Sequence, residues 1–215
     1  CAIRVESEGV PIGKWRDRCP GCIDKTSGFL DMLGIPYSFN GDYVTDAERA
    51  ELWEKTEGIT MENLSQFTEA GVALGNNVRS SIIRYLQGAA LTGHEAVVRE
   101  FTHSALITAR AATNAIDKLE PWRLFMSHGI YVDWGPALHV ARRRGIPVTA
   151  WKSSYLTSHF YFRPVEDPSR IDFKALSPDT WKEVKNAELT PRQNARLDKF
   201  FDDRYKKNIS FDMRN

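Results

Sequence analysis

Long hydrophobic runs are missing from this chain of 215 residues. No stretch of about 18 apolar residues occurs, so the sequence predicts no transmembrane span. The first residues also lack the apolar segment of a secretory signal peptide. An initiator methionine is absent as well, and we therefore expect a processed or trimmed chain.

Cysteine and excess charge are scarce too. Three cysteines are too few and too uneven in number for a disulfide framework, which favours a cytoplasmic location. The net charge of +1 gives no general attraction for nucleic acid or for a membrane surface. The composition, 42% hydrophobic and 27% charged, is that of an ordinary globular protein. We expect no nucleic-acid partner.

Three phosphate-binding or metal-binding motifs are also missing. The chain has neither the G-x-G-x-x-G of dinucleotide-binding folds nor the G-x-x-x-x-G-K-[ST] of P-loop proteins. This disfavours nicotinamide-dependent dehydrogenases and P-loop kinases. No D-x-D occurs, so a transferase built on this chain would not bind a metal through that motif.

The clearest positive pattern predicts a strand, a helix and a second strand over residues 123–126, 136–144 and 146–151. Pro136 stands at the expected helix start and Gly145 just past its end. Two strands joined by one helix form a right-handed parallel crossover. We therefore predict an α/β fold, a Rossmann-like parallel sheet flanked by helices.

Ligands of such sheets bind at the carboxyl ends of the strands. After the first strand we predict His128 and Asp133 as catalytic residues, with Gly129, Tyr131 and Trp134 as substrate-binding residues. The loop expected after the second strand supplies further substrate-binding residues, namely Lys152, Ser153, Tyr155 and His159.

Each of these residues has a structural alternative. His128 would act as a general base on a hydroxyl or donate to a phosphate, or else fill a turn or cap the helix. Asp133 would orient His128 or cap the helix that follows. The helix start at 135–137 could hold a phosphate. The loop from Lys152 would bind a diphosphate or sugar, or be merely solvated with aromatic rings beneath it.

Cys19 and Cys22 form a C-x-x-C pair in a region, residues 1–27, that we expect to be irregular. The pair is half of a zinc site, but no second C-x-x-C and no H-x-x-x-H follows. Basic neighbours at Arg18 and Lys25 would favour redox chemistry, although no hydrophobic strand precedes the motif. Plain structural cysteines are the third alternative.

Further helices are expected over residues 46–55, 61–70, 78–87 and 95–119, the last packed against a sheet. Thr45 and Glu48 have the spacing of a capping box at the first of these helices. We predict one Rossmann-like lobe over residues 1–165. Residues 166–215 would form a polar, helical extension or a linker toward a second lobe.

Residues 127–151, S-H-G-I-Y-V-D-W-G-P-A-L-H-V-A-R-R-R-G-I-P-V-T-A-W, followed by K-S-S-Y-L-T-S-H-F-Y-F, resemble the amino-terminal lobe of bacterial surface-polysaccharide glycosyltransferases of the capsule polysaccharide biosynthesis type. The upstream elements R-D-R-C-P-G-C and G-V-A-L-G-N-N-V-R-S-S are similar in character. The resemblance covers about residues 10–165 and implies one lobe of a two-lobe GT-B-like enzyme.

The resemblance implies transfer of a sugar from a nucleotide-activated donor to a surface-polysaccharide or lipid-linked acceptor. The amino-terminal lobe would bind the acceptor, with His128 as base or acceptor contact and Gly129 and Tyr131 lining the cleft. No cofactor is implied beyond the nucleotide-sugar substrate, and peripheral membrane association is compatible with a lipid-linked acceptor. Two alternatives stay open: a non-catalytic sugar- or nucleotide-binding module, and a metal-binding protein that uses the CPGC motif.

Overall fold

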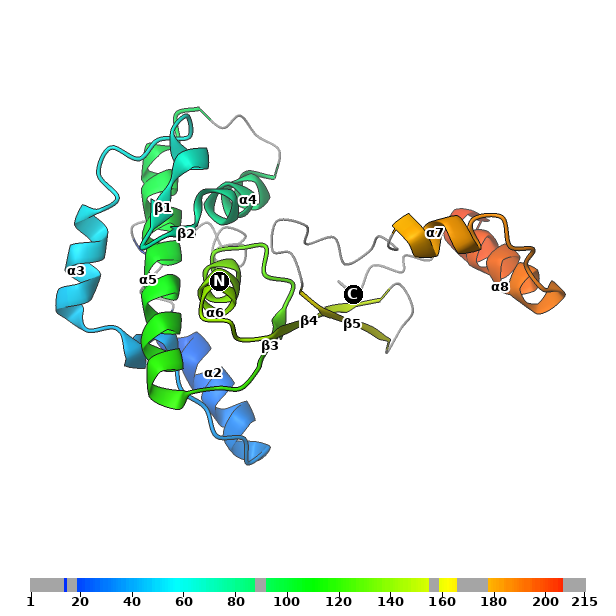
Figure 1. The fold of residues 1–215 in the computed structure, drawn as a ribbon, viewed down its shortest axis with the longest axis horizontal. Coiled ribbons are helices and arrows are strands. Elements are labelled where there is room, and N and C mark those ends of the chain that lie inside the picture. The colour runs from blue at the N-terminus through cyan, green and yellow to red at the C-terminus, as the bar shows by residue number, and fades with distance from the viewer. Residues whose placement is uncertain (1–13, 15–18, 88–91, 155–158, 166–177, 207–215) are drawn as a thin grey trace.

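The chain is a mixed α/β protein in which helices predominate (Figure 1). The structure, a computed structural model, describes residues 14, 19–87, 92–154, 159–165 and 178–206. Its α-helices are α2 (Cys19–Met32), α3 (Asp46–Glu54), α4 (Gly75–Leu86), α5 (Glu95–Leu119), α6 (Gly135–Arg143), α7 (Pro178–Val184) and α8 (Pro191–Phe201). The strands are β1 (Thr68–Glu69), β2 (Val72–Ala73), β3 (Leu124–Ser127), β4 (Val148–Ser153) and β5 (Phe160–Pro164). Short helical turns are η2 (Asn40–Tyr43), η3 (Leu64–Gln66) and η4 (Asp202–Lys206).

The long helix α5 forms the centre of the larger core. The predicted bounds, 95–119, are confirmed, and the helix ends at Glu120 in the left-handed conformation just before Pro121. Its packing differs from the prediction, because it lies chiefly against α6, η2 and α4 rather than against a sheet. The reason is its broad apolar face, which fits the aliphatic faces of neighbouring helices; the core residues include Leu52, Leu64, Val78, Ile82, Val98, Leu106 and Val140. Among the described residues, none of the helices combines the length and apolarity needed to cross a bilayer.

The predicted strand–helix–strand unit is present, with β3, α6 and β4 in order (Figure 1). Strands β3 and β4 pair in parallel, with Leu124 opposite Val148 and Ser127 opposite Trp151. Gly145 follows α6 with φ +71°, and the N–H of Ile146 bonds back to Ala141 O at 2.9 Å. These contacts end the helix in the way that glycine past a helix end predicts.

The sheet is mixed rather than purely parallel. Strand β4 continues to Ser153, and β5 returns beside it in antiparallel register, Lys152 opposite Tyr161. The segment that the sequence predicted as a polar loop is therefore largely a hairpin. The run Phe160, Tyr161 and Phe162 explains this, because aromatic residues favour strands. On the inner face, Met126, Val148 and Ala150 pack with Leu138 of α6 in a second, smaller core.

The predicted helix over residues 61–70 is wrong. That region holds the short turn η3 and then the hairpin β1–β2, in which Thr68 pairs with Ala73 and Glu69 with Val72. The turn residues Ala70 and Gly71 both have positive φ, +47° and +74°. This is the backbone of a two-residue hairpin turn, whose twist matches that of the flanking strands. The glycine at the second turn position, Gly71, indicates a hairpin, but the helical spacing of the apolar residues favoured a helix in the prediction.

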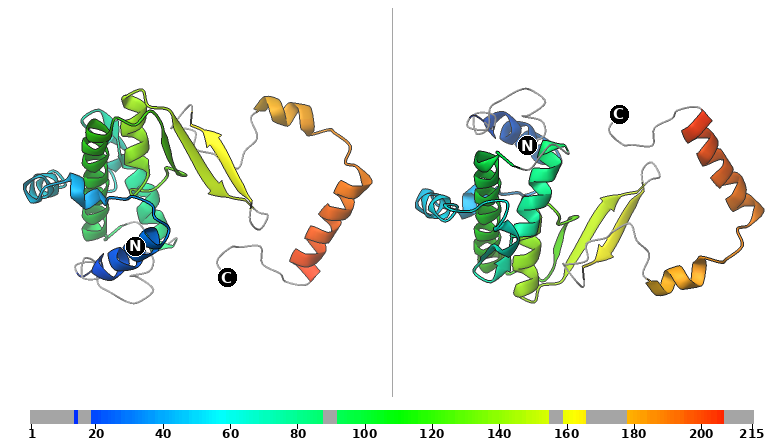
Figure 2. Two further views of the ribbon diagram at one scale, coloured as in Figure 1. Left: turned by 90° about the horizontal axis from the view of Figure 1, so that it is seen from below. Right: turned by 90° about the horizontal axis from the view of Figure 1, so that it is seen from above.

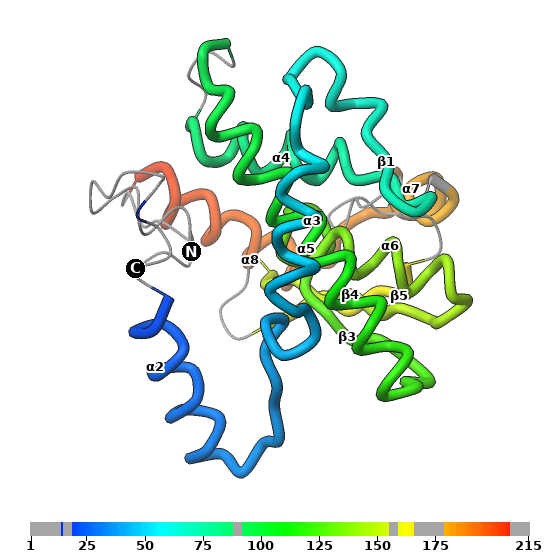
Figure 3. The backbone as a smooth tube through the Cα atoms, turned by 90° about the vertical axis from the view of Figure 1, so that its left-hand side faces the viewer, coloured from blue at the N-terminus to red at the C-terminus, as the bar shows by residue number. Residues whose placement is uncertain are grey.

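Residues 1–27 are not irregular throughout, because α2 begins at Cys19. The helix projects from the body, as the tube in Figure 3 shows, and none of its residues is buried. Apolar side chains on and after it stay exposed, including Phe29, Met32 and Leu33. Helix α2 therefore adds little to the core.

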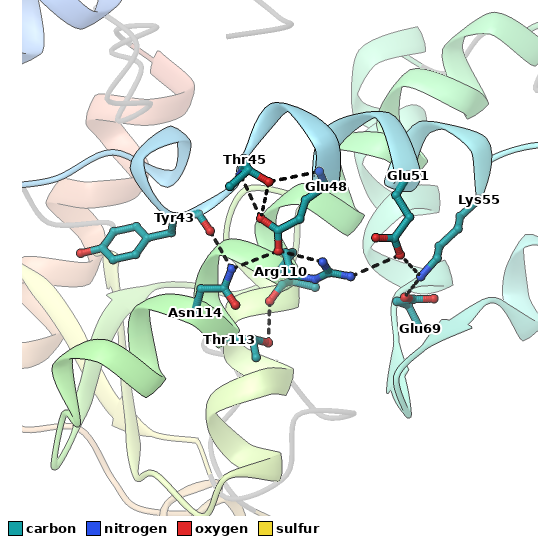
Figure 4. Close-up of polar contacts among 10 residues, drawn as sticks. Tyr43, Thr45, Glu48, Glu51, Lys55, Glu69, Arg110, Thr113 and Asn114 are labelled. Atoms are coloured by element: carbon teal, nitrogen blue, oxygen red, sulfur yellow. Dashed lines mark hydrogen bonds and ion pairs between the residues drawn. The ribbon is translucent and has the colours of Figure 1, made fainter.

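A polar network attaches α3 to α5 (Figure 4). The predicted capping box is confirmed: Glu48 N–H donates to Thr45 Oγ1 at 3.2 Å, and Thr45 N–H donates to Glu48 Oε2 at 2.9 Å. The other carboxylate oxygen of Glu48 accepts from Arg110 Nη1 at 2.9 Å. These bonds, the Thr45 backbone N–H first and Arg110 second, lower the pKa of Glu48 to about 2. Every charged group here has a partner, so the network is structural.

Helices α7 and α8 stand apart from the sheet, as both views in Figure 2 show. They cover much of the predicted extension, 166–215, of which residues 166–177 and 207–215 lie outside the described part. A capping box at Thr190 and Gln193 begins α8. The division of the chain at residues 165 and 166 stays a prediction.

Candidate functional site

His128 follows the carboxyl end of β3, where the sequence predicts a site. Its side chain is half-buried, neither sealed in the core nor fully exposed. The ring meets Tyr131 edge to face, with 5.1 Å between ring centroids and 88° between their planes. The N–H of Ile130 donates to His128 Nδ1 at 3.3 Å. The imidazole is thus held from two sides by its own loop.

Burial lowers the pKa of His128 below its ordinary value. The carboxylate of Asp133 acts in the opposite direction, whereas the cations of Lys152 and Arg84 lower the pKa further. These three side chains come from different elements of the fold, so His128 lies where two cations and one carboxylate converge. The lowered pKa favours the neutral form of the ring near pH 7.

The contact with Ile130 determines what the neutral ring can do. A ring nitrogen that accepts a hydrogen bond carries no proton, so the proton of neutral His128 is on Nε2. In this arrangement Nε2 is a donor, suited to a phosphate or carboxylate oxygen. A general base would need a lone pair facing the hydroxyl, and Nδ1, which has one, faces Ile130. The structure therefore favours His128 as a hydrogen-bond donor over His128 as a general base. The sequence had left both roles open.

One face of α4 holds the loop that carries His128. Buried Asn77 donates from Nδ2 to Gly129 O at 3.3 Å and to Ile130 O at 2.9 Å. One turn later, Ser81 Oγ accepts from the N–H of Val132 at 3.0 Å. These contacts fix the loop backbone from Gly129 to Val132.

The same face of α4 continues to Arg84, which approaches Tyr131. Its Nη1 donates to the Tyr131 hydroxyl at 3.3 Å, and the guanidinium carbon lies 5.3 Å from the ring centroid. Asn77, Ser81 and Arg84 have the i, i+4, i+7 spacing of one helix face, and sequence reasoning missed all three. The signal that could have found them was this polar stripe on an otherwise apolar helix.

Two glycines let these parts approach closely. Gly129 has φ +66°, and a Cβ there would lie 2.6 Å from Leu138 Cδ2. A Cβ on Gly135 would overlap the Asn77 side chain. Because Gly135 and Pro136 are themselves buried, protein atoms fill the start of α6. The predicted phosphate position at 135–137 is therefore wrong.

Asp133 and Trp134 are exposed beside His128. Trp134 is the residue that precedes α6, and no side chain caps this helix. The alternative of Asp133 as a helix cap is therefore wrong. Its carboxylate remains close enough to His128 to act on the pKa of the imidazole.

The residues predicted after the second strand are spread along a hairpin. Lys152 and Ser153 lie within β4 rather than in a loop, and both are half-buried. His159 precedes β5, is exposed, and accepts at its backbone oxygen from Ser154 N–H at 2.9 Å. Tyr155 lies outside the described residues. Of this group, Lys152 is the residue whose charge acts on His128.

The CPGC motif lies on the first turn of α2, where Cys19 is exposed and Cys22 is half-buried, both as free thiols. Within the part of the chain that the structure describes, no three side chains of His, Cys, Asp or Glu gather as metal ligands. Cys19 and Cys22 thus have no described third ligand.

No protein-family model, no curated protein and no solved structure matches this chain.

Proposed function

We propose that this chain binds a phosphate-bearing sugar ligand at the His128 cluster, as one lobe of a glycosyltransferase. The cluster comprises His128, Tyr131, Asp133, Arg84 and Lys152. The observation that carries the proposal is the set of donors and cations at the carboxyl end of β3: His128 and Tyr131 from the loop after β3, Arg84 from α4 and Lys152 from β4. Such groups suit phosphate oxygens, for which charge-assisted hydrogen bonds are the strong contacts.

Sugar transfer from a nucleotide donor moves the glycosyl group to an acceptor hydroxyl and leaves a nucleoside diphosphate. Nε2–H of His128 and the guanidinium of Arg84 would bind phosphate oxygens of the donor or of a lipid-linked acceptor, and so stabilise charge on the leaving group. A neutral imidazole is a competent donor for this role. Acceptor and donor partners of this kind belong to a cytoplasmic protein that works at a membrane surface, which is part of the proposal.

The catalytic form of the proposal also assigns the acceptor proton to His128, with Asp133 stabilising the imidazolium that forms. This step requires the ring to release the Ile130 N–H or to change its tautomer. Substrate binding would have to drive that change. His128 and Asp133 therefore remain our proposed catalytic pair.

A second candidate function is a non-catalytic module that binds a sugar phosphate or a nucleotide. The contact between Ile130 N–H and His128 Nδ1 favours it, because the ring is already arranged as a donor. Both functions share the ligand chemistry. They differ in whether loss of the imidazole abolishes turnover or only weakens binding.

Calorimetric titration with inorganic phosphate, uridine diphosphate and a panel of nucleotide sugars tests the shared part. His128→Ala and Arg84→Ala should each weaken binding of the ligands that bind by at least about tenfold, the usual value of a charge-assisted contact. Arg79→Ala is the matched control, because Arg79 is an exposed arginine on the same helix. Unchanged affinity in the first two variants, or an equal loss in the control, would refute the proposal.

Turnover then separates the two functions. Release of the nucleoside diphosphate in the presence of acceptor would show transfer, and His128→Ala should abolish it while the thermal midpoint stays near that of the wild type. A variant that keeps full turnover excludes His128 as a catalytic residue. If ligands bind but no pair of donor and acceptor is turned over, the chain is a non-catalytic binding module.

A further inference from the structure

The sheet β3–β4–β5 has two faces of different chemistry. The inner face carries the aliphatic residues Met126, Val148 and Ala150 beneath α6 and, by strand register, Lys152, Tyr161 and Arg163 toward β5. By strand register, the outer-face positions hold Phe125, Ser127, Thr149, Trp151, Ser153, Phe160, Phe162 and Pro164. None of these is Val, Ile or Leu, and none is charged.

The rings on this outer face form one connected cluster, here called the aromatic face: Phe125, Trp151, Phe160 and Phe162. Phe125 stacks on Phe162 with 5.8 Å between centroids and 22° between planes. Phe160 lies 6.5 Å from Phe162 and 5.7 Å from Trp151. In spite of these contacts, Phe125 is 58% exposed, Phe160 50% and Phe162 62%. Contiguous exposed apolar surface of this kind suits a binding site.

We infer that the aromatic face binds a glycan chain built of neutral sugars; this rests on the proposed function, which supplies the glycan as a ligand class. Each pyranose ring has an apolar C–H face and a rim of hydroxyls. The aromatic rings would stack on the C–H face of the sugar, and hydroxyl side chains of the same sheet face would form hydrogen bonds with the sugar hydroxyls. Ligand sites commonly combine apolar and aromatic surface with a few polar groups in this way.

The hydroxyl groups of the outer face support this choice. Ser127, Thr149 and Ser153 alternate with the rings along β3 and β4. Arg123 Nη1 donates to Thr149 Oγ1 at 3.0 Å, which brings one guanidinium to the rim of the face. A glycan can exchange hydrogen bonds with these groups, whereas an apolar protein surface would bury them without partners at a cost in free energy.

Two other occupants fit less well. Single-stranded nucleic acid also stacks on sheet aromatics, but it needs a cationic track for its phosphates, and the face offers one guanidinium, Arg123, at its rim. A second copy of the chain would also suit aromatic rings, which protein interfaces favour, but the hydroxyl groups that alternate with the rings favour a glycan.

Calorimetric titration with cellohexaose, maltohexaose and chitohexaose tests the inference on the full chain. Phe125→Ser and Phe162→Ser should each weaken binding of the hexasaccharide that binds by about fivefold to tenfold, as expected for loss of one stacked ring. Trp181→Ser is the matched control, because Trp181 on α7 is 56% exposed and lies apart from the sheet. Both phenylalanines are exposed, and circular dichroism checks that the variants stay folded.

Several results would overturn the inference: no binding of any hexasaccharide, equal loss in the Trp181 control, or binding of oligothymidylate that the phenylalanine variants abolish. A dimer seen by sedimentation that Phe162→Ser dissociates would assign the face to a second copy instead. Single-residue variants distinguish failure of this inference from failure of the proposed function. Arg84→Ala should weaken phosphate binding and leave the hexasaccharide affinity unchanged, and the phenylalanine variants should do the reverse.

Discussion

Asn77→Ala tests whether α4 holds the loop of His128. Asn77 is 4% exposed, and its Nδ2 donates to two carbonyls of that loop, Gly129 O and Ile130 O. Its Oδ1 is buried and has no partner. The side chain also fills the space against Gly135. Truncation to alanine removes both hydrogen bonds and leaves a small cavity at the start of α6.

The magnitude follows from these contacts. Each lost hydrogen bond costs about 1 kcal/mol net, and a carbonyl left buried without a partner costs about 1–3 kcal/mol. Removal of the unpartnered Oδ1 and the better helix propensity of alanine, about 0.5 kcal/mol, act in the opposite direction. We expect the free energy of unfolding to fall by about 2–3 kcal/mol, which lowers the thermal midpoint by about 4–12 °C for a chain of this size.

Urea unfolding followed by tryptophan fluorescence measures this change, with Asn76→Ala as the matched control. Asn76 is exposed on the same turn of α4, so its replacement has the same propensity effect and none of the loop contacts. Nitrogen NMR of the His128 ring gives a second readout. Without Asn77, the Ile130 N–H should leave Nδ1, and the population of the Nε2–H tautomer should fall. A difference of less than about 0.5 kcal/mol between the two variants, with an unchanged tautomer, would refute the reasoning.

Gly129→Ala should lower the free energy of unfolding by about 1–3 kcal/mol, because alanine is strained at φ +66° and its methyl would meet Leu138; an unchanged urea midpoint would contradict this. Below pH of about 6.5 the chain should lose stability, since burial holds the pKa of His128 under its unfolded value and the unfolded chain binds the proton first. His128→Asn should reduce the loss of stability in that pH range, to which His139, whose pKa burial also lowers, contributes as well; an identical profile would contradict the role given to His128. Glu48→Gln should destabilise the protein at pH 7, and the difference in thermal midpoint should disappear as the pH falls from 4.5 to about 2, where Glu48 itself becomes protonated. Exposed Glu62 supplies the control, Glu62→Gln, and a difference that persists at low pH would show that charge is not the cause.

Local patterns were sufficient where an element depends on its own residues. The bounds of α5, the capping box at Thr45 and the helix between Pro136 and Gly145 were all predictable, because periodicity, caps and breakers act over one or two turns. The parallel pairing of β3 and β4 followed from the same unit.

Predictions failed where a partner strand or a turn conformation decided the outcome. The hairpin at Ala70 and Gly71 needs two residues of positive φ, which outweigh an apolar spacing that also suits a helix. Beyond Trp151, the polar residues Lys152 and Ser153 suggested a loop, but pairing with β5 extends the strand. Cross-strand contacts of this kind join residues that no short window of sequence contains.

The sequence by itself determined the α/β class, the main helices and the place of His128 just after a strand, because each depends on residues near in the chain. Only the tertiary structure decided how that histidine is used. Asn77 and Arg84 reach its loop from a helix more than forty residues earlier, and Lys152 acts from the next strand. The burial, the tautomer and the electrostatic surroundings of His128 depend on all the residues that lie around it in space. The order of residues along the chain does not specify which residues those are.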